Sequence, residues 1–480
     1  MFILKLGNLR IYFIFIIVNL VSLLCGLMLT WASPVLPKFS TSNNPLGRQI
    51  TSTEQSWIAS LVSLGGVFGP PLSGLIMDKF GRKPAIACVH LPNIVSTLLA
   101  AFGNNIWYFY IARFLAGMSI YSGISIGAVY FGEVAEVSRR GLLYSTTSIF
   151  INLGSLLSYC IGSYTSIKVF NLILLAIALV GMTGTSIFVV ESPHFLVQKL
   201  RFVEAKSALI EMRDPNICGD IEIQKELNVI QEYVSNKVPS EGVRSIVKSK
   251  VARKAFLMSL IVTSMQQFSG IIIIYFSIQL IFQKSGSSLG PEISSIIVGG
   301  LQFVTICFTS FGVDHLGRKR MLCISSTGLT FTLALLGIFF NFQSFDRSTA
   351  SEIDWLPLVC LFFFLIFFNS GLGGVPFLYM SEILPANIKS ISISIAMAIH
   401  CLIGFMLTYF YNGIVEGIGA SGTFFMFSGC MGIFCIYVFI VLFETRGMNL
   451  QDIQKRLGRS TRSKNAFEAI VESEKGVGKF

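Results

Sequence analysis

The chain alternates between long apolar runs and short polar breaks. Each run has about 20 residues, enough for a helix to cross roughly 30 Å of hydrocarbon. Six runs lie near residues 11–31, 57–77, 85–102, 106–130, 142–164 and 169–190, and six more near residues 255–282, 293–313, 321–340, 356–380, 391–411 and 423–443. The pattern predicts an all-α polytopic membrane protein with twelve transmembrane helices in two pseudo-symmetric six-helix halves.

Polar stretches divide this pattern into four parts. The long central break contains Ile223, Leu227, Ile230 and Val234, which recur at helical spacing. This spacing predicts a short amphipathic helix that packs beneath the membrane helices, and a loosely ordered linker is the alternative. The expected parts are an N-terminal half at 1–190, a cytoplasmic linker at 191–254, a C-terminal half at 255–443 and a cytoplasmic tail at 444–480.

The composition supports a membrane location and explains the net charge. Hydrophobic residues make up 53% of the 480 residues and charged residues 13%, whereas an ordinary soluble domain has roughly 25% charged residues. If the N-terminus starts inside, most of the 36 Lys and Arg residues lie on the cytoplasmic side, as the positive-inside rule requires. The net charge of +11 therefore needs no nucleic-acid partner. We expect a multi-pass protein of the plasma membrane with both termini in the cytoplasm.

Short charged motifs recur in the two halves with the same spacing inside each motif. The stretch Gly65–Lys83 is an apolar, glycine-spaced helix that ends in charged residues, and a similar stretch ends at Lys319. The repeated pairs are Asp78 and Asp314, Arg82 and Arg318, Glu133 and Glu382, and Arg140 and Lys389. Two copies of one unit that meet near the membrane midplane are typical of secondary transporters.

The second apolar run carries two local signals. Gly65, Gly69 and Gly74 predict that another helix approaches closely, because small residues allow such contacts in membranes. Ser52 and Gln55 have the spacing of a capping box, which predicts a helix start at Ser52.

These motifs together, in this order, resemble those of the sugar porters of the major facilitator superfamily, and within them the branch of insect facilitated trehalose transporters. The resemblance covers residues 11–456. The matching signatures are GxxxDxxGRK in both halves (Ser310 replaces the first glycine of the second copy), Arg113-Phe, Glu133 with Arg139-Arg-Gly, Glu191-Ser-Pro, Gln266-Gln-Phe-Ser-Gly, Glu382 with Pro385, and Glu444-Thr-Arg-Gly.

The resemblance implies that the repeated charges form a cytoplasmic latch, which closes the inner mouth when the carrier faces outward. Asp78 would meet Arg82 or the positive N-terminus of a neighbouring helix. The alternative is that these charges only fix topology, but topology needs the positive residues and not the paired acids. The expected members are Asp78, Arg82, Glu133 and Arg140 in the first half and Asp314, Arg318, Glu382 and Lys389 in the second.

Arg113 is the charge that we expect well inside a span. A buried ion is costly, so a gating role is one hypothesis, and a side chain that extends to the outer interface is the other. In related proton-coupled porters an acid in the first span is the partner of this arginine. Residues 11–31 contain neither Asp nor Glu, so the sequence favours uniport over proton symport.

Gln266 and Gln267 are adjacent amides on an otherwise apolar helix. An amide donates and accepts hydrogen bonds as a sugar hydroxyl does, so the pair suits sugar recognition, and a tie between helices is the alternative. Consecutive helical residues point about 100° apart, so we expect only one of the two to face the cavity fully. The resemblance places further substrate-binding residues at Ser148, Gln302, Asn369, Phe377 and His400.

The predicted cavity is less polar than a typical hexose site. Ile272 stands where most relatives have Asn, and Phe377 stands where Trp is usual. Without a Walker A sequence or clustered histidines, we expect no enzymatic activity and no cofactor. The sequence therefore predicts a monomeric, facilitative carrier of trehalose or a hexose that works by alternating access. The alternatives are a proton-coupled sugar symporter, a carrier of a less polar metabolite and a non-transporting sugar sensor.

Overall fold

The structure, a computed structural model, is built from helices throughout its described residues. It describes residues 9–40, 44–134, 140–213, 219–235, 246, 249–285, 290–345, 353, 355–385, 388–446, 448, 452–453 and 455–457.

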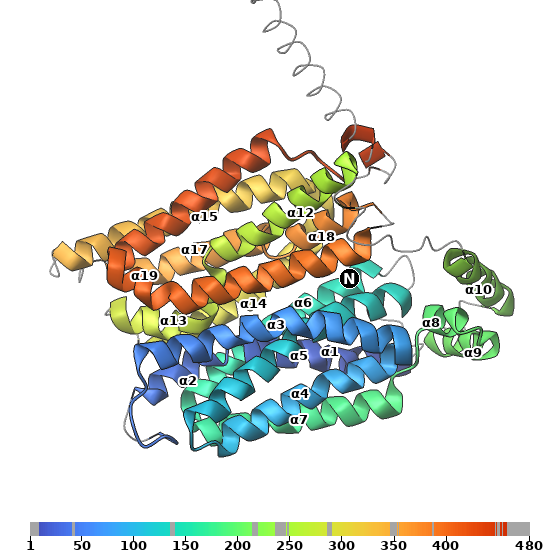
Figure 1. Cartoon of the computed structure of the whole chain (residues 1–480), viewed down its shortest axis with the longest axis horizontal. Coiled ribbons are helices and arrows are strands. Elements are labelled where there is room, and N and C mark those ends of the chain that lie inside the picture. Colours follow the sequence, from blue (N-terminus) through green and yellow to red (C-terminus); the bar gives the residue numbers. More distant parts are fainter. Residues whose placement is uncertain are drawn as a thin grey trace, which may run out of the picture.

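Two helical bundles lie side by side (Figure 1). The N-terminal bundle contains α1 (Leu9–Leu29), α2 (Ala32–Phe39), α3 (Ser52–Phe80), α4 (Arg82–Phe102), α5 (Ile106–Val134), α6 (Arg140–Tyr164) and α7 (Ile167–Phe188). The C-terminal bundle contains α12 (Lys250–Phe268), α13 (Ile271–Ser285), α14 (Pro291–Leu316), α15 (Arg318–Phe345), α17 (Leu356–Ser370), α18 (Val375–Ile383) and α19 (Lys389–Ile440). Each of the twelve predicted apolar runs coincides with one of these helices, with a part of one, or with two that are separated by a short break.

The helices have the length and composition of membrane spans. Within the described part of the chain, nine helical segments are long and apolar enough to cross a membrane. One of them, Ile391–Ile440, contains two predicted runs, because α19 changes direction at Gly419, where φ is 75°. The two arms of α19 are visible at the left of Figure 1. All-α polytopic architecture follows from the sequence pattern and is confirmed.

Two of the predicted spans are broken helices in the C-terminal bundle. The break between α12 and α13 falls at Ser269 and Gly270, and Gly270 has a φ of 81°, which residues with a side chain rarely adopt. The break between α17 and α18 falls at 371–374. Such breaks free backbone carbonyls inside the membrane, so nearby side chains must supply donors.

Three short helices lie at the right-hand end of Figure 1, and we name this end of both bundles the linker end and the opposite one the far end. They are α8 (Pro193–Gln198), α9 (Phe202–Met212) and α10 (Asp220–Ser235). Helix α10 contains the predicted amphipathic spacing, and its residues Ile223, Leu227 and Ile230 are buried against Leu209 and other apolar residues of α8 and α9. These helices therefore have a small apolar core of their own.

Glycines allow α3 and α5 to pack with their backbones in contact. A Cβ atom on Gly65 would lie 2.0 Å from the carbonyl oxygen of Phe114, and one on Gly69 would lie 2.2 Å from that of Met118. The prediction was wrong for Gly74, where a Cβ atom would meet no atom within 4 Å. Close helix contact therefore uses only the first two of the three glycines.

The capping box of α3 lies one residue before the predicted position. The Thr51 hydroxyl accepts from the backbone N–H of Glu54 (3.2 Å), and the Glu54 carboxylate accepts from that of Thr51 (2.9 Å). Glu54 also accepts from Arg48 (2.8 Å). Ser52 and Gln55 have the same spacing, but a charged carboxylate with an arginine partner binds the N-terminal N–H groups more strongly than an amide does.

We predict that Gly65→Ala destabilises the protein and that Gly74→Ala does not. The new methyl group at position 65 would overlap a backbone carbonyl, which cannot move away as a flexible side chain can. The expected loss in the free energy of unfolding is about 1–3 kcal/mol or more. Thermal unfolding of the two purified variants measures this difference. Equal unfolding temperatures would show that α3 and α5 can separate without cost.

Candidate functional site

Gln266, on the last turn of α12, ties the two helix breaks together. Its side-chain nitrogen donates to the carbonyl oxygens of Leu372 (2.7 Å) and Gly373 (3.3 Å), both in the break between α17 and α18. Those carbonyls lack helical partners, so the amide satisfies acceptors that the break leaves free. Gln266 thus has the bracing function that we had considered as the alternative for this pair.

Gln267 faces His400 of α19. The His400 Nδ1 atom lies 2.9 Å from the Thr263 carbonyl oxygen, which can only accept, so Nδ1 carries the proton. In the neutral ring Nε2 is then an acceptor, and the Gln267 Nε2 atom donates to it at 2.8 Å. This chain of bonds fixes the orientation of the Gln267 amide. Its oxygen, Oε1, is buried and has no hydrogen-bond partner in the described structure.

Asn369 lies on the last turn of α17, next to the other break. Its side chain is buried, and its Nδ2 donor has no hydrogen-bond partner in the part of the chain that is described. Phe377, on α18, packs edge-on against His400 with ring centroids 5.7 Å apart. An amide acceptor without a described partner thus lies near the first break, and an amide donor without one lies near the second.

Gln302 of α14 connects the two bundles. Its Nε2 atom donates to the Asn152 Oδ1 atom of α6 (2.7 Å) and to the Tyr275 hydroxyl of α13 (3.0 Å). Ser148 contributes its backbone carbonyl, which accepts from the Asn152 side chain at 2.8 Å. Gln302 and Ser148 thus belong to one polar chain that crosses between the bundles.

Arg113 is fully inside the protein, with 2% of its surface exposed. Its guanidinium donates to the carbonyl oxygens of Met28 (2.9 Å) and Ile58 (3.1 Å). The rings of Trp31 and Phe276 lie 5.0 and 5.9 Å from it, and Phe276 belongs to the C-terminal bundle. The side chain does not extend to the outer interface, so that alternative is wrong. None of the contacts described for Arg113 is to a carboxylate.

Contacts at the far end hold the two bundles together. Trp57 of α3 packs at a tilt of 59° against Tyr409 of α19 with ring centroids 4.8 Å apart, and Asn412 donates to the Ser56 hydroxyl at 3.0 Å. On the other side of the interface, Gln279 of α13 donates to the Ser163 hydroxyl of α6 at 2.7 Å. The bundles are therefore joined by polar and aromatic contacts beyond the level of the helix breaks.

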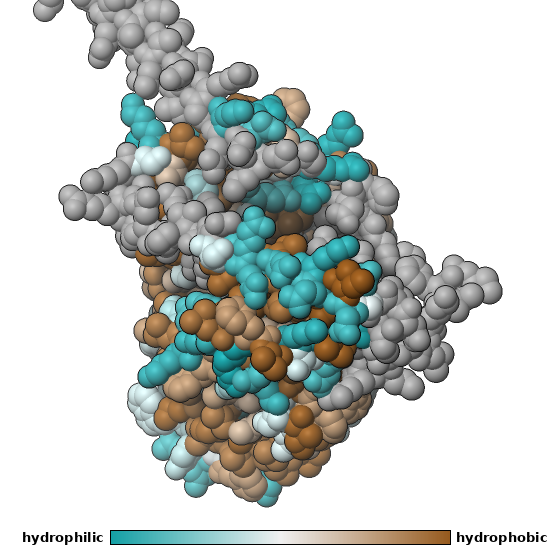
Figure 2. All heavy atoms as spheres, turned by 90° about the vertical axis from the view of Figure 1, so that its right-hand side faces the viewer, coloured by the Kyte–Doolittle hydropathy of each residue, from teal (hydrophilic) through white to brown (hydrophobic). Residues whose placement is uncertain are grey.

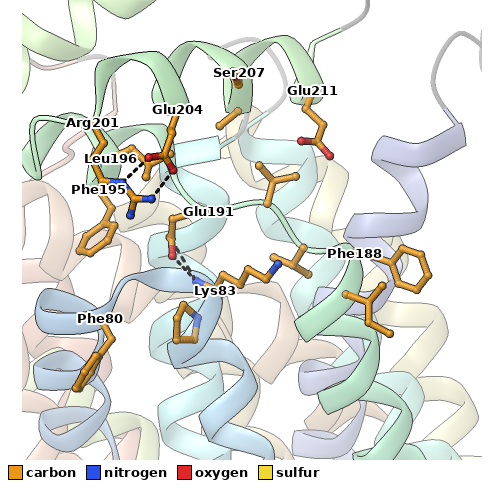
Figure 3. A pocket seen from close by; sticks show the side chains of 15 residues that line it. Phe80, Lys83, Phe188, Glu191, Phe195, Leu196, Arg201, Glu204, Ser207 and Glu211 are labelled. Atoms are coloured by element: carbon orange, nitrogen blue, oxygen red, sulfur yellow. Dashed lines mark hydrogen bonds and ion pairs between the residues drawn. The ribbon is translucent and has the colours of Figure 1, made fainter.

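At the linker end, Arg82 and Glu133 form a bidentate ion pair. Arg82 Nε and Nη2 lie 2.7 and 2.6 Å from the two carboxylate oxygens, and the Ser192 hydroxyl donates to the same carboxylate at 2.5 Å. The neighbouring Glu191 accepts from the backbone N–H groups of Arg82 (2.8 Å) and Lys83 (3.3 Å), which begin α4 (Figure 3). A carboxylate at a helix N-terminus is favourable because the N–H groups there lack partners.

The C-terminal bundle repeats this arrangement residue for residue, although both Arg318 contacts go to one oxygen of Glu382. Arg318 Nη2 lies 3.0 Å from Glu382, and the Thr445 hydroxyl donates to Glu382 at 2.5 Å. Glu444 accepts from the backbone N–H groups of Arg318 (2.8 Å) and Lys319 (3.1 Å) at the start of α15. The repeated charges in the sequence thus correspond to repeated ion pairs, each of which joins three segments of one bundle.

The other predicted latch residues lie at the same end. Asp78 is exposed on the last turn of α3 and makes no ion pair or hydrogen bond with a described side chain. Burial lowers the pKa of Lys389, and the nearby Glu382 carboxylate opposes this shift. The side chains of Arg140 and Asp314 lie outside the described part of the structure.

The structure adds four residues that we had not assigned to the site: Glu191, Ser192, Glu444 and Thr445. A signal was available in the sequence, because an acid followed by Ser or Thr recurs after the sixth and the twelfth apolar run. Spacing alone did not show that these carboxylates bind helix N-termini.

Comparison with known proteins gives a consistent assignment. Residues 18–457 match the family described as sugar (and other) transporters. The chain is 30% identical over 454 residues to the facilitated trehalose transporter Tret1 of Apis mellifera ligustica, which spans 94% of this chain and 88% of that protein. It is also 30% identical to the Tret1 protein of Culex quinquefasciatus over 92% of this chain and 84% of that one.

Solved structures show the same fold. The inward-open xylose transporter XylE from E. coli superposes with a TM-score of 0.75 at 18% identity, over 93% of this chain and 99% of that one. Its partially occluded inward-open form gives a TM-score of 0.74 at 17% identity, over 92% and 100% of the two chains. Because the family match spans almost the whole chain, this protein belongs to the sugar (and other) transporter family and has the major facilitator fold.

Proposed function

We propose that this family member is a facilitative carrier of trehalose or a hexose. The observation that supports the proposal most is the unpartnered Gln267 acceptor and Asn369 donor beside the two helix breaks. Leaving a buried polar group without a hydrogen-bond partner costs about 1–3 kcal/mol of stability. A sugar hydroxyl can bind either the acceptor or the donor, because it both donates and accepts hydrogen bonds. The similarity to trehalose transporters supports the disaccharide, and the Phe377 ring offers an apolar wall for the face of a sugar.

We propose alternating access between the two bundles as the mechanism. The contacts of Trp57 with Tyr409 and of Gln279 with Ser163 would break when the far end opens. Asp78, which pairs with none of the described side chains while the far end is packed, would gain its partner when the linker end closes. In this scheme the carrier is a monomer in the plasma membrane with both termini in the cytoplasm, and Arg140, Asp314 and Lys389 complete the latch.

We propose uniport because Arg113, the buried cation between the bundles, has no proton-accepting partner among its described contacts. Arg113 binds two carbonyl oxygens and two aromatic rings. A carboxylate next to it could gain and lose a proton during transport, whereas a carbonyl oxygen cannot. The arrangement therefore supports a gradient-driven carrier that moves sugar in either direction.

Uptake of a panel of labelled sugars into vesicles that contain the purified protein tests this function. We expect trehalose or a hexose to equilibrate without accumulating, and a proton ionophore to leave the initial rate unchanged. Accumulation above the external concentration that collapses with the pH gradient would reject uniport. If none of the sugars enters faster than in empty vesicles, the substrate assignment is wrong.

Gln267→Ala should weaken the apparent affinity for sugar, whereas Gln266→Ala should mainly lower stability. The first change removes the free acceptor, at a cost of about 1–3 kcal/mol, or about five- to a hundredfold in affinity. The second leaves two carbonyls of the helix break without a donor. Concentration-dependent uptake at matched surface abundance, together with thermal unfolding, separates the two effects. The assignment fails if the affinity is unchanged in both variants.

Glu133→Gln should destabilise the protein far more than Glu204→Gln. The Arg82–Glu133 pair is mostly buried (8% and 18% exposed), and breaking such a pair costs about 3–5 kcal/mol. The Arg201–Glu204 pair is 54% exposed on both sides, and its loss should cost about 0–1 kcal/mol. Unfolding of the purified variants provides the comparison, and similar losses for both would contradict the bracing function of Glu133.

A further inference from the structure

A cavity of about 500 Å³ lies at the linker end of the N-terminal bundle, away from the helix breaks (Figure 3). It is open to the outside and is lined by α8 and α9 on one side and by the ends of α3, α4 and α7 on the other. Its volume falls within the range of about 300–1,000 Å³ that is usual for ligand sites. None of the residues proposed to bind sugar lines it.

The membrane side of this cavity is apolar. Phe80 and Ile187 are 59% and 68% exposed, and Phe188 is also exposed. Phe80 and Phe188 are the last residues of two helices that are long and apolar enough to span a membrane. The cavity therefore begins at the level where these spans end, and its apolar side continues the lipid-facing surface. Figure 2 shows hydrophilic and apolar side chains next to one another at this end of the molecule.

Charged side chains line the cavity as well, from the start of α4 and from α9. The side chain of Lys83 extends into the cavity (Figure 3) and forms no ion pair with the described residues. The nearby charges are already engaged, since Glu191 binds the backbone N–H groups of α4, and Arg201 and Glu204 pair with each other. Lys83 is therefore a lining cation whose charge a ligand can neutralise, and the carboxylate oxygens of Glu204 and Glu211 lie along α9, where they can accept further hydrogen bonds.

We propose that this cavity binds a glycerophospholipid from the membrane leaflet on the linker side. The phosphate binds Lys83, because an ammonium group is a compact positive charge that pairs well with phosphate. The start of the acyl chains lies along Phe80, Ile187 and Phe188, and headgroup hydroxyls donate to the α9 carboxylates. The lipid bridges α9 to the ends of the membrane helices, next to the Glu191 carboxylate that caps α4.

Native mass spectrometry of the purified full-length protein tests this site. The probes are phosphatidylglycerol, diacylglycerol, which has the chains without the phosphate, and glycerol 3-phosphate, which has the phosphate without the chains. We expect the first phosphatidylglycerol adduct to form at the lowest concentration. Equal binding of diacylglycerol would show a merely apolar surface, and displacement of the lipid by glycerol 3-phosphate would show a site for soluble phosphates. Either result would overturn the proposal.

Two variants locate the adduct. Lys83→Gln removes the cation and should weaken binding of the first phosphatidylglycerol by about tenfold, and Ser207→Trp should have the same effect because it fills the cavity from α9. The matched controls are Lys225→Gln and Ser235→Trp, which change exposed residues of α10 outside the cavity. Unchanged binding in Ser207→Trp that unfolds normally overturns the proposal even if Lys83→Gln does not fold.

Discussion

The fold depends on pairs of carboxylates at the start of a helix. One carboxylate accepts from the backbone N–H groups there, and the other binds the arginine side chain of the same turn. Glu191 accepts from the N-terminus of α4, and Glu133 holds the Arg82 side chain of the same turn. These bonds join α3, α4, α5 and the segment after α7 at a place where lipid, protein and water meet. Glu444 and Glu382 do the same for α15. Each bundle is thus closed at the linker end by charge-assisted bonds, which are stronger than neutral ones, so it can move as one body.

At the linker end the polar groups have partners, whereas near the helix breaks at the centre two buried amide atoms have none among the described residues. Breaking a helix in the membrane exposes carbonyls that need donors. Gln266 supplies a donor to the break after α17, while the His400 ring fixes the amide of Gln267 so that its oxygen has no partner among the described residues. Gln266 therefore braces the helix break, whereas the oxygen of the adjacent Gln267 remains available to a ligand. This division follows from the angle between consecutive helical residues.

Arg113 links these two levels of structure. It is buried without a carboxylate among its described contacts, and one of the rings that it touches belongs to the other bundle. Separation of the bundles at the far end would remove that ring from the cation. Because arginine stays protonated in proteins, the loss of this contact would not be relieved by deprotonation. The far-end contacts of Trp57 and Gln279 add to this interface. Movement between states would exchange all of these contacts together.

The sequence by itself determined the twelve apolar runs, the duplication and the residues of the ion pairs, because hydrophobic length and the spacing of charges are properties of the chain. It did not determine which partner each group has. Thr51 and not Ser52 caps α3, and Gly74 faces open space although it has the spacing of Gly65. Arg82 binds Glu133, while Asp78 pairs with none of the described side chains. These outcomes depend on distances between segments far apart in the chain, and only the packed tertiary structure sets those distances.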